Sequence, residues 1–298
     1  MTGNGAVRGK IAFYCRVLKV TRQGFYSYLE SLSRPYKYEA LVALMKGIIA
    51  EDECNDTYGA KRMREALLLK QETNPELPVP SQPTIARVMR QNGLLHKKKR
   101  KPNSLTEADK EAQKSDDLLG RDFGADEPEI KCVTDITEVP TADGKLYIAA
   151  YEDCFNNEVL GLSMADNMRA RLCVNALKTA VSLHPGLRGA IAHSDRGSQY
   201  TSVEYRLALE QFGIKQSMNS AGGRCHDNAK CESLWGRFKE ELLYGRYRTE
   251  KMSMEDVKSL VWRYFMGYWN NRRICSANGG LPPVEKRRRF LLAREYAA

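Results

Sequence analysis

The chain has 298 residues, of which 47 are Lys or Arg and 37 are Asp or Glu, and its net charge is +10. This length exceeds the usual size of one domain, so we expect two or three structural units. No apolar run reaches the roughly 20 residues of a membrane span, and the start MTGNGAVRGK lacks the apolar core of a signal peptide. The composition therefore argues against a membrane protein and predicts a cytoplasmic location.

The cysteines and histidines form no recognisable metal or disulfide pattern. There are eight Cys and four His, and no two Cys are spaced as Cys-x-x-Cys. We therefore expect neither a disulfide framework nor a structural zinc site.

Charge is distributed unevenly along the chain. Residues 1–101 carry a net +10 from 19 basic and 9 acidic residues, and residues 102–129 carry −6 from 3 basic and 9 acidic residues. The remainder, 130–298, carries +6 from 25 basic and 19 acidic residues. A basic front suits a polyanion such as nucleic acid, whereas a solvated basic surface without a specific partner is the alternative.

Helical spacing of apolar residues marks the first hundred residues. In 11–29 it is interrupted by TRQG, which predicts a helix-turn-helix-like segment in 1–36. Three further short amphipathic helices follow in 37–101, and the last of them, TIARVMRQNGLL, begins after a capping Ser and ends at Asn-Gly. Three such helices are typical of a DNA-reading domain, although small helical bundles also serve other purposes.

The last of these helices stands in the position of a recognition helix and is followed by the basic run HKKKRK. Its arginines and the basic run are our candidate DNA contacts in this region: Arg87, Arg90, Lys97, Lys98, Lys99, Arg100 and Lys101.

A different pattern follows the acidic, aromatic-poor segment 102–129, which we interpret as a linker or a loosely packed helix. In 130–245 three strand-like runs, CVTDITEV, KLYIAAYEDCF and VLGLSMAD, precede alternating helical and strand-like runs. This order predicts an α/β domain with a mixed sheet flanked by helices. Residues 246–298 are predicted to form a helical extension whose aromatic residues Trp262, Tyr264, Tyr268 and Trp269 serve mainly in packing.

Two aspartates stand where buried strands would hold them at a sheet edge. Asp135 interrupts the first strand, and Asp195 ends the run IAHSD 60 residues later. Glu232, a further 37 residues on, lies at the start of a long helix. A charge in such a place is costly unless it is paired or binds a cation, and three converging carboxylates suit a hard divalent cation such as Mg²⁺. A chance triple is the alternative, and Asp153 is a rival acid.

The wording around these acids carries more information than their spacing. TDIT, HSDRGSQYTS, GIKQSMNSAGGRCHDNAKCESLWGRFKEEL and YWNNRR closely resemble, in this order, the OrfB-type DDE transposases of the insertion-sequence three (IS-three) family, relatives of retroviral integrases. TYGAKRMREAL and TIARVMRQNGLL resemble the helix-turn-helix front of the same family. The resemblance implies an RNase H-like fold, with Asp135, Asp195 and Glu232 as catalytic acids and metal ligands.

The chain departs from the family pattern at a few positions. Cys132 stands where the family usually has Trp, and Cys275 where it often has His. The interval between Asp195 and Glu232 holds 36 residues where the family usually has 35, and we expect the loop NSAGGRCHDNA to absorb the extra residue.

Polar residues beside the acids are candidates for holding DNA. Near Asp195 and along the helix of Glu232 these candidates are Arg196, Ser198, Gln199, Asn228, Arg237 and Lys239. For Gln199 a role in the turn is the alternative, and for Arg237 and Lys239 a solvated helix face.

The resemblance implies a nucleoid-associated bacterial enzyme that binds the terminal inverted repeats of its own insertion sequence as double-stranded DNA. It implies metal-dependent strand cleavage followed by strand transfer into target DNA, with two Mg²⁺ ions or Mn²⁺ in their place. A homo-oligomer on DNA and a product of an upstream reading frame are the expected partners. A decayed transposase that only binds DNA, and a ribonuclease on the same fold, are the alternatives.

Overall fold

The computed structural model describes residues 10–33, 36–96, 116–120, 122–219 and 228–297. Its internal contacts divide the chain into a small unit, Met1–Lys46, and a large unit, Gly47–Ala298. None of the helices in the described ranges combines the length and the apolar character that crossing a membrane requires.

The small unit contains α1 (Ile11–Val17), α2 (Arg22–Ser33) and the start of α3 (Glu39–Ala50). The predicted helix-turn-helix spacing is present, but the break lies earlier than expected, because α2 already begins at Arg22 and includes Gly24. The reason is a cap: the Thr21 hydroxyl accepts a hydrogen bond from the Gly24 amide at 3.0 Å. Within the described parts of α1 and α2 only Cys15 is buried.

The large unit begins with the end of α3, the 3₁₀ turn η2 (Glu53–Thr57), α4 (Ala60–Thr73) and α5 (Gln82–Gln91). One face of α5 is buried through Ile85, Val88 and Met89. The helix ends at Gln91, because Gly93 adopts a positive φ of 67° and the Leu94 amide bonds back to the Met89 carbonyl.

Five strands form one mixed sheet. They are β1 (Lys131–Thr141), β2 (Gly144–Asp153), β3 (Val159–Ala165), β4 (Ile191–Ser194) and β5 (Lys215–Met218). The spatial order is β3-β2-β1-β4-β5; the pairs β3/β2 and β2/β1 are antiparallel, whereas β1/β4 and β4/β5 are parallel. The predicted fold class, a mixed RNase H-like sheet preceded by a helical region, is confirmed.

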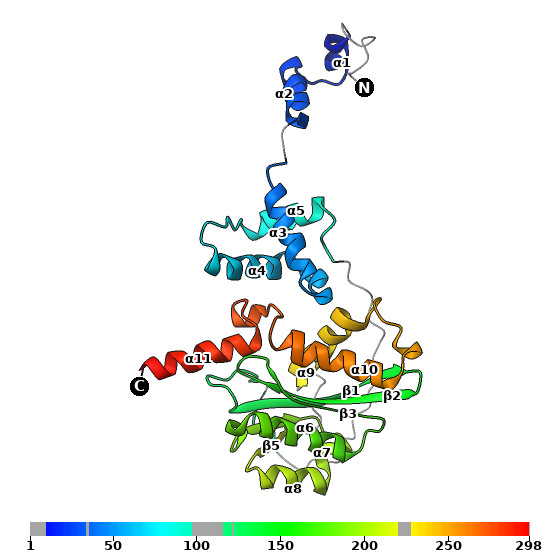
Figure 1. Ribbon diagram of the computed structural model, residues 1–298, viewed down its shortest axis with the longest axis vertical. Helices are drawn as coiled ribbons and strands as arrows, with labels where there is room; N and C mark the ends of the chain where they lie inside the picture. The colour runs from blue at the N-terminus through cyan, green and yellow to red at the C-terminus, as the bar shows by residue number, and fades with distance from the viewer. Residues whose placement is uncertain (1–9, 34–35, 97–115, 121, 220–227, 298) are drawn as a thin grey trace. The chain divides into compact units, whose positions relative to one another are not determined.

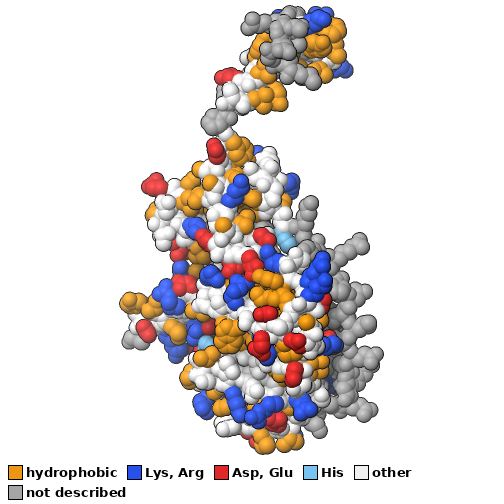
Figure 2. Space-filling view, turned by 45° about the vertical axis from the view of Figure 1, so that its right-hand side comes forward, with side chains coloured by type: hydrophobic (Ala, Val, Ile, Leu, Met, Phe, Trp, Pro, Cys, Tyr) orange, Lys and Arg blue, Asp and Glu red, His pale blue; other side chains and the backbone are white. Residues whose placement is uncertain are grey.

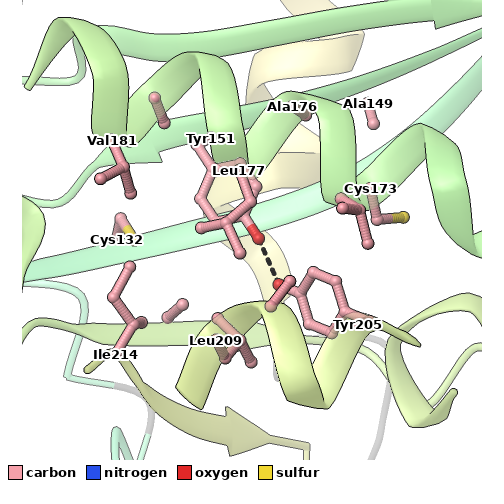
Figure 3. Packing of buried hydrophobic residues seen from close by; sticks show 14 of the residues in the cluster. Cys132, Ala149, Tyr151, Cys173, Ala176, Leu177, Val181, Tyr205, Leu209 and Ile214 are labelled. Atoms are coloured by element: carbon pink, nitrogen blue, oxygen red, sulfur yellow. Dashed lines mark hydrogen bonds between the residues drawn. The ribbon is translucent and has the colours of Figure 1, made fainter. Parts of the chain in front are cut away.

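Helices cover both faces of this sheet, as Figure 1 shows. The helices on one face are α6 (Ala170–Leu183), α7 (Ser198–Thr201) and α8 (Val203–Gln211), with the short turn η3 (Pro185–Leu187) after α6. Gly161 of β3 permits the close approach of α6, because a Cβ there would lie 2.4 Å from the Ala176 carbonyl oxygen. In this core the hydroxyls of Tyr151 and Tyr205 bond to each other (Figure 3).

The second core lies on the opposite face. It packs β1–β3 against α9 (Ala229–Phe238), the π-helical turn η5 (Lys239–Leu243), α10 (Met254–Trp262) and the π-helical segment η7 (Arg263–Trp269). The remaining C-terminal elements are η6 (Thr249–Lys251), η8 (Ser276–Asn278) and α11 (Pro283–Ala297).

The predicted packing role of the aromatic run is confirmed for Tyr264, Tyr268 and Trp269, which are buried in this second core. Trp262, in contrast, is 49% exposed at the end of α10 and does not belong to this core.

The described end of the acidic segment, 116–129 without residue 121, packs against the sheet. The Asp116 carbonyl accepts a hydrogen bond from the Met218 amide at 3.1 Å, and the Leu118 amide donates to the Ser217 hydroxyl at 2.9 Å. Leu119 is buried against Val133 of β1. This part of the segment therefore adds to the edge of the sheet beside β5.

Basic and acidic side chains are interspersed on the face shown in Figure 2. In the part of the chain that the structure describes, several basic side chains form ion pairs with acidic ones, among them Arg263, Arg272 and Arg289.

Candidate active site

The strand β1 places Asp135 on the face of the sheet that α9 covers. Asp135 pairs in register with Ala150 of β2, which belongs to the core on the α9 side. Its Oδ2 accepts a hydrogen bond from Nε1 of Trp235 in α9 at 3.1 Å. The alternation of side chains along the strand thus turns the carboxylate toward the helix.

Asp195 comes to the same edge of the sheet by way of the neighbouring strand. β1 and β4 are parallel, and Val133 pairs with His193. Asp135 stands two residues after Val133, and Asp195 stands two residues after His193, directly beyond the end of β4. Neighbouring strands of a sheet are about 4.8 Å apart. The Gly197 amide then donates to Asp195 Oδ1 at 2.9 Å. A Cβ on Gly197 would lie 3.1 Å from that oxygen, so this tight turn favours glycine.

Both aspartates hold their protons more tightly than usual. Burial raises the pKa of Asp135 to about 7, with repulsion from Asp195 and, more weakly, from Glu232, while the Ile136 amide and Trp235 act in the opposite direction. Burial also raises the pKa of Asp195, although its bond from Gly197 and the nearby His193 oppose this. Within the described ranges neither carboxylate forms an ion pair with Lys or Arg. This donor set of carboxylate oxygens suits a hard cation.

Glu232 lies on the first turn of α9 and is exposed. The helix starts beside β1, because Asn228, which precedes it, donates a hydrogen bond from Nδ2 to the Thr134 carbonyl at 3.3 Å. Glu232 is close enough to raise the pKa of Asp135. Nevertheless, no three His, Cys, Asp or Glu side chains among the described residues are placed so that they could hold a metal ion. The two aspartates therefore come to the same edge of the sheet, and Glu232 as the third metal ligand stays a prediction.

The rival acid Asp153 lies elsewhere. It pairs with Cys132, three residues from Asp135 along β1. Its oxygens accept hydrogen bonds from the amides of Glu129 and Phe155 at 3.0 and 2.9 Å. Asp153 thus stabilises a turn. Cys132, which replaces the usual Trp, is buried in the core beneath α6.

The candidate DNA contacts near Asp195 occupy three different environments. Arg196 is buried; its Nε donates to the Asn219 carbonyl at 2.7 Å, and its Nη2 has no hydrogen-bond partner among the described residues. Ser198 is exposed. Gln199 donates to the Met168 carbonyl at 3.0 Å, which is the turn role named as the alternative.

The candidates on α9 lie along one helix but differ in burial. Asn228 is buried, and its Oδ1 has no partner within the described ranges. Arg237 is exposed and donates to the Ser233 hydroxyl at 3.2 Å. Lys239 is half-buried; burial lowers its pKa, against the attraction of Glu138 and Asp135.

In the helical front, Arg87 and Arg90 are exposed on the face of α5 opposite its buried residues. The basic run Lys97, Lys98, Lys99, Arg100 and Lys101 lies outside the described residues, and so does most of the loop expected to absorb the extra residue, at 220–227.

Two contacts around Asp135 go beyond what the sequence indicates. Trp235 is a core residue that also bonds Asp135, and its place three residues after Glu232 was the available signal. Tyr200 of the motif SDRGSQYTS is buried, and its hydroxyl lies 3.2 Å from that of Thr134, beside Asp135. The motif thus contacts β1 through Tyr200 and also contains Asp195.

Known proteins resemble this chain over most of its length. Two family models described as Integrase core domain match residues 125–223 and 213–283. The transposase InsF for insertion sequence IS3A of Escherichia coli (strain K12) is 32% identical over 277 residues, which cover 91% of each chain. The insertion element IS600 uncharacterized 31 kDa protein of Shigella sonnei is 32% identical over 278 residues, covering 93% of this chain and 98% of the relative.

Among solved structures, the catalytic core domain of HTLV-2 integrase in complex with magnesium aligns with a TM-score of 0.38 and 16% identity, covering 55% of this chain and 99% of that one. A simian T-cell lymphotropic virus intasome aligns with a TM-score of 0.42 and 16% identity, covering 51% of this chain and 52% of that one. On the sequence relationships, the chain belongs to the transposases of the IS3 family of insertion sequences, DNA-acting DDE polynucleotidyl transferases with an integrase catalytic core.

Proposed function

We propose that Asp135, Asp195 and Glu232 are the catalytic acids of this transposase and that they bind two Mg²⁺ ions, which Mn²⁺ can replace. The observation that carries the proposal is the pair Asp135 and Asp195: two half-buried carboxylates with raised pKa values at one sheet edge, which form no ion pair with Lys or Arg within the described ranges. Buried charges without a protein counterion are costly, so their presence argues for an external cation. Glu232, on α9, completes the set when its side chain moves toward the two aspartates.

When bound, a pair of Mg²⁺ ions activates the attacking oxygen and stabilises the leaving oxygen of a phosphodiester. The chain's own residues prepare this edge of the sheet. Trp235 and the Ile136 amide hold Asp135, and the Gly197 amide holds Asp195 by Oδ1. Both side chains are therefore oriented before DNA arrives.

The reaction has two steps of the same chemical type. Water first attacks a phosphodiester at the element end, its oxygen bonds to phosphorus, and the bond to the 3′ oxygen breaks to give a 3′-OH. That hydroxyl next attacks a phosphodiester of target DNA in line, and the displaced oxygen of the target strand leaves with a proton. No Ser or Tyr of the protein becomes covalently attached.

Several basic and amide groups are placed to hold the DNA backbone at this edge. The buried Nη2 of Arg196, next to Asp195 in the chain, has no partner among the described residues, and the charges of Glu138 and Asp135 raise the pKa of Lys239 against the effect of burial. Ser198, Asn228 and Arg237 extend this set along the motif and α9. Charge-assisted bonds to phosphate are the strongest that such groups can make.

Recognition of the terminal inverted repeats falls to residues 1–101, through Arg87 and Arg90 of α5 and the basic run 97–101. Exposed arginines opposite a buried helix face support this assignment. A homo-oligomer on double-stranded DNA is the proposed assembly, with the product of an upstream reading frame as a further partner. The domain boundaries predicted at residues 36, 101, 129 and 245 remain predictions.

The test is strand cleavage of duplex DNA that contains an element end, with Mg²⁺ or Mn²⁺, by the full chain and by Asp195→Asn. We expect metal-dependent nicking at the element end by the unchanged protein and none by the variant. Binding without cleavage by the unchanged protein would instead support a decayed transposase that only binds DNA. Preference for an RNA–DNA hybrid over duplex DNA would support a ribonuclease.

A further inference from the structure

A buried acid lies outside the proposed active site, on the continuation of the helix that carries the exposed Glu232. Glu241 belongs to η5, which continues α9 without a break, and it is buried. Its two oxygens accept four hydrogen bonds: from Arg273 Nε and Nη2 at 2.8 and 2.7 Å, from Arg62 Nη1 at 2.7 Å and from the Tyr264 hydroxyl at 2.9 Å.

The partners of Glu241 come from widely separated segments. Arg62 belongs to α4, and Arg273 is the last residue of the motif YWNNRR. Each arginine also stacks on an aromatic ring, Arg62 on Tyr58 at 4.8 Å and Arg273 on Trp269 at 4.3 Å. Glu241 therefore joins three parts of the large unit at one point, which we call the Glu241 clamp: Arg62, Glu241, Tyr264 and Arg273.

The helix that carries Glu232 is fixed to the rest of the unit near both of its ends. At the start, Asn228 bonds to the Thr134 carbonyl beside Asp135. At the far end, the Glu241 clamp holds η5. Glu232 is exposed and lies between these two anchors. Because a helix moves as a rigid rod over a few turns, a shift at η5 changes the distance between Glu232 and the two aspartates.

We propose that Glu241 is a positioning residue for DNA cleavage: through Arg273 and Arg62 it holds the segment 229–243 where Glu232 can join Asp135 and Asp195 in binding the metal. This inference rests on the proposed function of the three acids and assigns a role to the motif YWNNRR. Glu241 itself touches neither DNA nor metal. Groups that orient metal ligands from outside typically change metal affinity or activity about ten- to a hundredfold when they are replaced.

The experiment compares three variants of the full chain: Glu241→Gln, Arg62→Gln and Arg263→Gln. Arg263→Gln is the matched control, because Arg263 pairs with Asp52 and Glu53 and so also ties η2 to the C-terminal region, but does not contact Glu241. We expect Glu241→Gln to raise the Mg²⁺ concentration for half-maximal cleavage about ten- to a hundredfold, with unchanged DNA affinity. Arg62→Gln should change it in the same direction by less, and Arg263→Gln should leave it unchanged.

A second readout, hydrogen exchange of the backbone amides in 229–243, does not depend on cleavage. We expect faster exchange around Glu232 in Glu241→Gln and Arg62→Gln than in Arg263→Gln. If Glu241→Gln fails to fold, Arg62→Gln and Arg273→Lys decide the question. An unchanged Mg²⁺ requirement and unchanged exchange in the folded variants overturn the positioning role. Absence of cleavage by the unchanged protein would count against the proposed function, while the exchange comparison would still decide on the clamp.

Discussion

Asp135 bonds to Trp235 of the segment 229–243 and Glu241 belongs to that segment, yet their pKa values are shifted in opposite directions. Burial, followed by repulsion from Asp195, raises the pKa of the half-buried Asp135 to about 7, although the Ile136 amide and Trp235 oppose this. Burial acts in the same direction on Glu241, but the charge and hydrogen bonds of Arg273, followed by Arg62 and the Tyr264 hydroxyl, outweigh it and hold that pKa at about 2. Glu241 is paired with two arginines, whereas Asp135 forms no ion pair with Lys or Arg within the described ranges.

The comparison teaches how to separate structural acids from functional ones in this molecule. A buried carboxylate that the chain saturates with arginines contributes to the fold and has no free oxygen for a ligand. A buried carboxylate that the chain leaves without a counterion is poised for a charge from outside. Four predictions test this difference.

The largest expected effect is on activity. Asp135→Asn should lower cleavage about a thousandfold, since metal stabilisation of transition-state charge is worth several kcal/mol. The free energy of unfolding without metal should not fall at pH 8, because the lost charge had no partner. Gel-based cleavage and urea unfolding measure the two quantities. Cleavage within tenfold of the unchanged protein would contradict the role of Asp135.

Glu241→Gln should affect the free energy of unfolding more than Asp135→Asn does, and cleavage less. The free energy of unfolding at pH 8 should fall by about 3–5 kcal/mol, because the buried Arg273 loses its counterion. The Glu241 pKa is lowered, so its contribution is present above about pH 4.5 and is lost as the pH falls toward 2. The difference between the two proteins should therefore shrink in acid. Urea titrations at several pH values would reveal this, and a gap below about 1 kcal/mol at pH 8 would refute it.

Magnesium should stabilise the protein more at pH 8 than at pH 6. The pKa of Asp135 is raised, so without metal its favourable contribution is complete below about pH 4 and is lost as the pH rises through 7. Above pH 7 the cation meets an ionised site and displaces no proton. We expect a gain in melting temperature of roughly 5–10 °C at saturating Mg²⁺ and pH 8, and less at pH 6. In Asp135→Asn the pH dependence of this gain should become smaller, because Asp195 remains as an acid of raised pKa; equal gains at both pH values in the unchanged protein would speak against an open cation site.

The smallest effect is expected for Trp235→Phe, which keeps the ring in the core and removes the hydrogen bond to Asp135. That bond lowers the pKa of Asp135, so its loss should move the acid limb of the cleavage profile to higher pH by roughly 0.5 to 1 unit. The rate at pH 9 should change little. A shift toward lower pH would mean that the bond favours the protonated carboxyl.

The aspartate pair could be predicted from the sequence, whereas the Glu241 clamp could not. Asp135 interrupts one apolar run and Asp195 ends another, and the parallel pairing of the two strands brings them to the same edge. The other inward-facing residues of the helix that contains Glu241 are apolar. Helical spacing therefore predicts that Glu241 faces inward, but it does not predict its partners. Its partners, 179 residues before and 32 residues after it, are set by tertiary packing alone.

The position of Glu232 illustrates a further limit. Sequence and family resemblance name the residue, but they do not fix the rotation of its side chain in the absence of a cation. In the structure it is turned to solvent while Asp135 and Asp195 already lie on adjacent strands. No pattern of apolar and polar residues encodes the direction of such an exposed side chain.

The bonds between η2 and the C-terminal region bear on how relatives of this protein exchange parts. Asp52 pairs with Arg263 and Arg272 at 3.4 and 3.1 Å, and Asn55 accepts a hydrogen bond from the Tyr268 hydroxyl at 3.0 Å. A chimaera spliced at residue 102, joining the front of one relative to the rear of another, would keep these bonds only where both relatives carry matching residues at these positions. An exchange of parts therefore succeeds only if both partners of each bond are exchanged together.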